Sequence, residues 1–121
     1  MIVTSLVTGT RAAQREAAIA ALLDPDQSTA VILEGLSDGN DILASLTSPR
    51  LNVARIAPGC MHCIGNLVMR VTLNRILREQ PQRLFISVAN DEHIEQLRAF
   101  LAAPPYQALL ELTDDIIPAS S

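Results

Sequence analysis

The stretch that decides the fold is formed by residues 1–23, MIVTSLVTGTRAAQREAAIAALL. Residues 1–7 are apolar and rich in β-branched side chains, which predicts a buried strand, and Gly9 follows it directly in a tight turn. Residues 10–23 then repeat alanine and leucine at helical spacing, and Asp24 and Pro25 end the pattern. The chain therefore opens with a strand, a glycine turn and a helix, the unit from which parallel sheets are built.

The same alternation continues along the chain. We predict further strands at residues 28–34, 51–57 and 83–88, a short helical turn at 42–46, and helices at 64–80 and 91–103. Residues 106–112 are expected to form a final helix or a short edge element. The pattern predicts one α/β domain over residues 1–112, with a three-layer, mostly parallel sheet that carries helices on both faces, and a polar tail at 113–121.

The densest apolar runs indicate which parts of the sheet are buried. We expect the strands at 1–7 and 51–57 to be central, because parallel strands covered on both faces read as apolar runs. The strand side chains expected to be buried are Val7, Val31, Leu33, Val53 and Ile56. The apolar face of the helix at 64–80 is expected to consist of Ile64, Leu67, Val68, Val71, Ile76 and Leu77. Aspartate in place of Val53 should therefore unfold the domain.

Composition excludes several classes of function. Of the 121 residues, 49% are hydrophobic. The nine basic residues are all arginines, and with 13 acidic residues the net charge is −4. A chain without lysine cannot use Schiff-base chemistry or a P-loop lysine. With no basic cluster and few aromatic residues, nucleic acid is not an expected partner. No apolar run approaches the roughly 18–20 residues of a membrane span, and the N-terminus lacks an export signal, so we expect a cytoplasmic protein without membrane association.

The first candidate site is the turn between the opening strand and helix, where a phosphate-binding loop would lie. Such a loop needs several glycines, a lysine for the phosphates and a hydroxyl for Mg²⁺. Here Gly9 is retained, Ala12 and Gln14 stand where later glycines would be, Arg15 replaces the lysine and Glu16 replaces the hydroxyl residue. These changes predict a degenerate loop that binds neither GTP nor ATP and does not catalyse their hydrolysis.

The second candidate site is Gly59-Cys60-Met61-His62-Cys63, which follows the strand at 51–57 and precedes the helix at 64–80. Both cysteines of the chain lie in it, three residues apart, so a helical turn would place their sulfur atoms on one side, with the His62 imidazole between them. The N-terminus of a helix favours the thiolate form of cysteine. The motif is therefore suited either to metal ligation or to redox exchange.

Together these features resemble the CobW-type family of metal-chaperone GTPases, whose nucleotide domain opens with V-T-G-x-x-G-x-G-K-[ST]-T and carries the motif G-C-x-C-C. Val7-Thr8-Gly9 matches the opening, and residues 59–63 match the cysteine motif with His62 in place of the middle cysteine. Residues 83–90, RLFISVAN, are similar to a strand that ends in I-E-x-[ST]-G, with Ser87 at the glutamate position and Asn90 at the glycine position. Residues 106–112 are similar to the Y-x-x-x-L-x-L stretch that follows.

The resemblance implies a P-loop-NTPase-like fold and a degenerate family member that represents the nucleotide domain only and has lost the GTPase motif. It implies a non-catalytic protein that binds or handles a metal, with Cys60, His62 and Cys63 as the ligands and zinc as the metal. A closed zinc site needs four ligands, so His93, the other histidine, is a candidate for the fourth. A homodimer that pairs two sets of cysteines is a second route, and a metal-receiving protein is the other implied partner.

Two other classes of function stay open. A C-x-x-C motif between a strand and a long helix is also the signature of a thioredoxin-like disulfide oxidoreductase, although two strand–helix units precede the motif here and thioredoxins usually have one. The third class is a structural interaction module, in which Arg70, Arg75 and Arg78 would face a partner. A solvated helix face explains these three arginines more simply.

Overall fold

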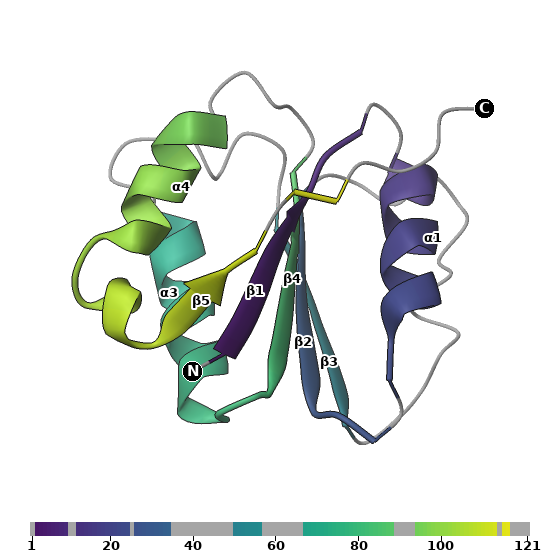
Figure 1. Cartoon of the computed structure of the whole chain (residues 1–121), viewed down its shortest axis with the longest axis horizontal. Coiled ribbons are helices and arrows are strands. Elements are labelled where there is room, and N and C mark those ends of the chain that lie inside the picture. The colour runs from purple at the N-terminus through teal and green to yellow at the C-terminus, as the bar shows by residue number, and fades with distance from the viewer. Residues whose placement is uncertain are drawn as a thin grey trace.

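The computed structural model describes residues 2–9, 12–24, 26–34, 50–56, 67–88, 94–113, 115 and 116. Its elements alternate along the chain as predicted (Figure 1). The strands are β1 (Ile2–Val7), β2 (Thr29–Glu34), β3 (Leu51–Ile56), β4 (Arg83–Ser87) and β5 (Leu110–Leu112). The helices are α1 (Ala12–Leu22), α3 (Leu67–Arg78) and α4 (Ile94–Ala102), and a single 3-10 turn, η3, covers Tyr106–Ala108. The helical turn predicted at 42–46 lies outside the described residues.

The strands form one sheet in the order β3-β2-β4-β1-β5, and each of its strand pairs is parallel. Helix α1 covers one face, and α3 and α4 cover the other (Figure 1). Val7 of β1 pairs with Ser87 of β4, which pairs in turn with Leu33 of β2. Glu34, the next residue of β2, pairs with Ile56, so the carboxyl ends of these four strands lie at one edge. The predicted three-layer α/β fold, similar to P-loop proteins, is confirmed.

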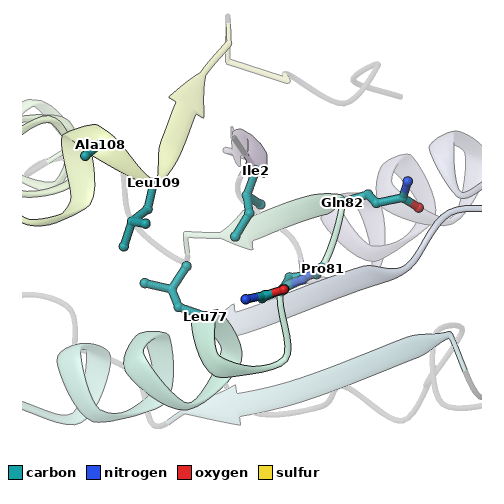
Figure 2. A pocket seen from close by; sticks show the side chains of 7 residues that line it. Ile2, Leu77, Pro81, Gln82, Ala108 and Leu109 are labelled. Atoms are coloured by element: carbon teal, nitrogen blue, oxygen red, sulfur yellow. The ribbon is translucent and has the colours of Figure 1, made fainter.

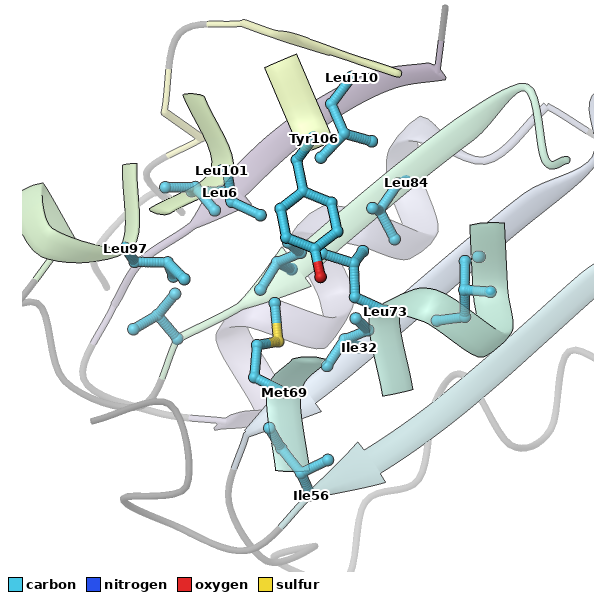
Figure 3. Packing of buried hydrophobic residues seen from close by; sticks show 14 residues of the cluster. Leu6, Ile32, Ile56, Met69, Leu73, Leu84, Leu97, Leu101, Tyr106 and Leu110 are labelled. Carbon is cyan, nitrogen blue, oxygen red and sulfur yellow. The ribbon is translucent and has the colours of Figure 1, made fainter. Parts of the chain in front are cut away.

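Alternation of side chains along the strands divides the apolar core between the two faces. The larger cluster lies under α3 and α4 and includes Leu6, Ile32, Ile86, Leu73 and Leu101 (Figure 3). The smaller cluster lies under α1 and consists of Val7, Ile19, Val31, Leu33 and Phe85. Consecutive residues of β1, β2 and β4 belong to different clusters, which is why helices on both faces are needed to bury them.

The prediction for the strand at 51–57 was wrong. Strand β1 lies between β4 and β5, but β3 lies at the end of the described sheet and pairs with β2 alone. Val7, Val31, Leu33 and Ile56 are buried as predicted, whereas Val53 is 36% exposed. Burial alternates in the second half of β3, where Val53 and Arg55 are exposed and Ala54 and Ile56 are buried, as in a strand with one exposed face.

The apolar face assigned to the helix at 64–80 also needs correction. Val71 is 60% exposed, and the buried positions of α3 are Met69, Thr72, Leu73 and Ile76, spaced as one helical face. Of the other expected members Ile76 is buried and Leu77 partly buried, whereas Ile64 and the side chains of Leu67 and Val68 lie outside the described residues. The arginines at 70, 75 and 78 are exposed, as a solvated face would be.

Residues 106–112 form the predicted short edge element, since η3 leads into β5 beside β1. The described part of the segment expected to be a polar tail continues along β1. The amide of Thr113 donates to the Thr4 carbonyl at 2.9 Å, and the amide of Ile116 donates to the Leu6 carbonyl at 2.8 Å. Asp115 forms an ion pair with Arg98 of α4. No helix within the described ranges is long and apolar enough to cross a membrane.

Candidate functional site

The candidate site lies where the connections of two neighbouring strands diverge. Strand β1 is followed by α1 on one face of the sheet, and β4, its neighbour, is followed by α4 on the opposite face (Figure 1). In open parallel sheets, ligands bind outside the carboxyl ends of the strands at such a switch point. The side chains that reach this position decide what the edge can bind.

Arg15, in the second turn of α1, occupies this position. Its side chain is buried, with 3% of the residue exposed. Nε donates to the Ser87 hydroxyl at 2.7 Å, and one terminal nitrogen donates to the Gly9 carbonyl at 2.6 Å. The other terminal nitrogen donates to the Glu34 backbone carbonyl at 3.4 Å. One guanidinium therefore joins the carboxyl ends of β4 and β2 to the turn that follows β1.

Gly9 in this turn has a local reason for its identity. Gly9 has φ of 149°, a backbone conformation that glycine adopts without steric cost. Its carbonyl accepts from Arg15, so the glycine retained from the phosphate-loop pattern orients an acceptor toward the arginine. The sequence predicted Gly9 as a turn residue, and the structure adds the hydrogen bond from Arg15 to its carbonyl.

Glu16 is the second buried charge at this edge. The residue is 1% exposed, and its carboxylate lies 3.6 Å from the guanidinium of Arg55, whose side chain is 29% exposed. Because Arg55 belongs to β3, this ion pair connects the start of α1 to the edge strand. Arg15 and Glu16 thus contact three strands and the turn after β1, and α1 is anchored at its N-terminal end by charged groups rather than by apolar packing alone.

The sequence analysis identified Arg15 and Ser87 separately as departures from the family pattern, and the structure brings them into contact. It did not predict Ser87 as a partner of Arg15, nor the burial of Glu34, which is 2% exposed. A signal existed in both cases, because each polar residue ends its strand directly after an apolar run, AVIL in β2 and LFI in β4. A buried polar side chain at a strand end requires a hydrogen-bonding partner.

A second polar cluster lies on the same face, toward the amino ends of the strands. Arg83 of β4 donates to the Ser5 hydroxyl at 2.9 Å and to the Val3 carbonyl at 3.2 Å, and its guanidinium lies 4.3 Å from the ring centre of Phe85. Burial lowers the pKa of Arg83 from its usual value. The Ser5 hydroxyl also bonds to the Thr113 hydroxyl, so this cluster joins β1, β4 and the C-terminal segment.

The residues predicted to bind metal, Cys60, His62, Cys63 and His93, lie outside the described residues. Among the residues that are described, no group of three or more histidine, cysteine, aspartate or glutamate side chains could hold a metal ion. Strand β3 ends at Ile56, at the edge that carries Arg15, and the cysteine motif follows in the sequence. The metal site therefore stays a prediction.

A shallow hollow of about 510 Å³ lies at the opposite edge of the sheet (Figure 2). Its lining includes Ile2 at the start of β1, Leu77 near the end of α3, and Leu109 just before β5. None of the residues predicted from the sequence to carry function lines it. The described site residues are at the carboxyl edge instead.

The fold is an α/β domain similar to P-loop proteins, and one of the comparisons with known proteins found a relative. Over 113 residues the chain is 32% identical to Zinc chaperone YeiR of Escherichia coli (strain K12), a match that covers 90% of this chain and 34% of the relative. This match supports a CobW-type relationship, and the chain spans about a third of the relative's length. No protein-family model matches the chain, and no solved structure matches it.

Proposed function

We propose that this chain is a metal-handling protein that binds zinc through its cysteine motif and works without a nucleotide. The observation that carries the proposal is the match to a zinc chaperone. It covers 90% of the chain, so it includes residues 59–63 near the middle of the sequence, where both cysteines stand. The relative's name concerns zinc, and thiolate and imidazole are ligands that zinc prefers.

The proposed ligands are Cys60, His62 and Cys63. Cys60 follows Ile56, the last residue of β3, by four residues, and four residues span at most about 14 Å. The motif is thus tethered near the carboxyl edge of the sheet. His93 directly precedes α4, which follows β4, another strand that ends at this edge. His93 is therefore the proposed fourth ligand within one chain, and a second copy that pairs its cysteines is the alternative source.

The nucleotide-independent part of the proposal is supported by Arg15 and Glu16. A nucleotide phosphate needs free N–H donors and a positive field at the start of α1. The guanidinium of Arg15 already donates to three protein oxygens, and the neighbouring Glu16 carboxylate is buried and would repel phosphate. The chain would therefore bind zinc as cargo, in a cytoplasm where thiols stay reduced, and pass it to a metal-receiving protein without GTP hydrolysis.

Zinc competition against a chromogenic chelator tests the proposal. The untagged chain should take zinc from the chelator, Cys60→Ser and Cys63→Ser should abolish this, and His62→Ala should weaken the affinity roughly tenfold or more. His93→Ala is a matched control, because the chain has two histidines: a loss here comparable to that of His62→Ala assigns His93 as the fourth ligand. Affinity should fall as the pH drops, because protons compete with the metal for thiolate and imidazole.

A disulfide-reductase assay on the same preparation separates zinc binding from thiol exchange. We expect no reduction of insulin. Reductase activity without zinc affinity would overturn the proposal in favour of an oxidoreductase. If Cys60→Ser and Cys63→Ser both keep the zinc affinity of the unchanged chain, the proposal is also overturned, because the metal would then be held elsewhere.

A further inference from the structure

We propose that the carboxyl edge of this sheet is an internal guanidinium-binding site that Arg15 itself fills. The site is formed by three oxygen acceptors from separate parts of the chain. They are the hydroxyl of Ser87 and the carbonyls of Gly9 and Glu34, at 2.7, 2.6 and 3.4 Å from the guanidinium nitrogens. The same place in this class of sheet commonly receives a ligand, and here it receives a side chain.

The shape of the acceptor set favours a guanidinium over other cations. Nε and both terminal nitrogens each donate to a different oxygen, so all three nitrogens of the planar guanidinium are used. An ammonium group has a single nitrogen, so it cannot donate to three acceptors that lie apart from one another as the three nitrogens of a guanidinium do. Lysine at position 15 would therefore keep the charge and lose most of these hydrogen bonds.

The surrounding charge also favours a cation. Arg15 is 3% exposed, so its charge is compensated by protein groups rather than by water. The next residue, Glu16, supplies a buried carboxylate, and Arg55 of β3 pairs with it. The carbonyl and hydroxyl oxygens that accept from Arg15 make this edge a site for a cation, opposite in polarity to the amide-lined loop that holds phosphate.

One consequence concerns regulation. Because the occupant is covalently part of the chain, the ends of β2 and β4 and the turn after β1 are held together at all times. The carboxyl ends of β2 and β4 therefore keep one arrangement that does not depend on a diffusible ligand. This inference does not rest on zinc binding, and its test uses neither zinc nor a nucleotide.

The test is chemical rescue of Arg15→Ala. Ethylguanidinium contains the two carbons and the guanidinium that this substitution removes. We expect Arg15→Ala to lower the melting temperature by about 10 °C, because two buried acceptors and one partly buried acceptor lose their donor. Ethylguanidinium at about 10 mM should restore roughly half of this loss in a saturable way, far below the molar concentrations at which guanidinium denatures proteins. Ethylammonium at the same concentration should restore none of it.

Two variants serve as controls for the rescue. Arg15→Ala combined with Ser87→Ala should lose most of the ethylguanidinium effect, because Ser87 supplies the one side-chain acceptor among the three. Arg75→Ala removes an exposed arginine and should show neither destabilisation nor rescue. Equal stabilisation by ethylammonium, rescue that survives Ser87→Ala unchanged, or no rescue at all would overturn the proposal.

Nitrogen-15 NMR of the unchanged chain provides a measurement that does not depend on a folded variant. The Nε–H of Arg15 should exchange with solvent at least tenfold more slowly than that of exposed Arg75, because it is buried and bonded to Ser87. Exchange as fast as that of Arg75 would contradict the internal site.

Discussion

Val31 of β2 and Val53 of β3 lie opposite each other in the parallel register, yet Val31 is fully buried and Val53 is 36% exposed. The difference comes from their positions in the sheet. Strand β2 has neighbours on both sides, and α1 packs over its centre, whereas β3 is the end strand of the described sheet. A charged residue should therefore destabilise the fold far more at position 31 than at position 53, although the two valines are neighbours in the sheet.

This pair provides a matched test of the sheet order. Val31→Asp should unfold the domain, because a carboxylate buried in the sheet has no compensating partner. Val53→Asp should cost only about 1–2 kcal/mol, because the aspartate can reach water. Thermal melts followed by circular dichroism compare the two variants. Unfolding by Val53→Asp, the outcome expected from sequence alone, would contradict the edge position of β3.

The chain should not bind nucleotides. A bound phosphate needs free N–H donors at this position, and Mg²⁺ needs a hydroxyl ligand. Here the guanidinium of Arg15 is hydrogen-bonded to Ser87, and Glu16 is a buried carboxylate. Calorimetric titration with GTP or ATP in the presence of Mg²⁺ should give no heat beyond dilution, which corresponds to a Kd weaker than about 1 mM. A micromolar Kd, or steady GTP turnover, would refute this expectation.

Tyr106 joins η3 to α3 through one hydrogen bond, from its hydroxyl to Asn74 Oδ1 at 3.0 Å. Its ring is buried in the larger core, beside Phe100 at 5.1 Å between ring centres. Tyr106→Phe should destabilise by about 1 kcal/mol, because exposed Asn74 can bond to water instead. Tyr106→Ala should cost about 3–5 kcal/mol through loss of the ring. Urea unfolding measures both, and equal losses would show that the ring does not fill the core.

The Glu16–Arg55 ion pair should respond differently to loss of each partner. Arg55→Ala removes a partly exposed cation and leaves the buried Glu16 carboxylate without this ion-pair partner. The free energy of unfolding should fall by about 1–3 kcal/mol after allowance for solvent screening. Glu16→Gln keeps the shape and removes the buried charge, so it should cost less than Arg55→Ala. Urea unfolding of both variants at neutral pH gives the comparison. A larger loss for Glu16→Gln would show that the buried charge itself stabilises the fold.

Much of the fold could be predicted because its signals are local. The runs at 1–7, 28–34 and 83–88 are apolar enough to be read as buried strands, and the structure has strands within each of them. A pattern of alternating strands and helices requires crossovers, and crossovers make a sheet parallel. The turn at Gly9 follows from the same reasoning.

The helix at 64–80 shows where local reasoning failed. Its sequence offers several apolar residues, and Val71 was counted among the buried ones although 60% of it is exposed. Thr72 is buried in its place, at 8% exposure. Helical spacing defines a face only to within one residue, and contact with the sheet then selects which residues point inward.

The sequence by itself determined the order of the main strands and helices along this protein, which residues could carry chemistry, and that the sheet is parallel, because these depend on spacing along the chain. Only the tertiary structure decided that β3 is an edge strand and that the Arg15 guanidinium meets Ser87, a residue 72 positions away. Contacts of this range depend on the order of strands in the sheet. The order is set by packing of whole faces, and no local pattern in the sequence encodes it.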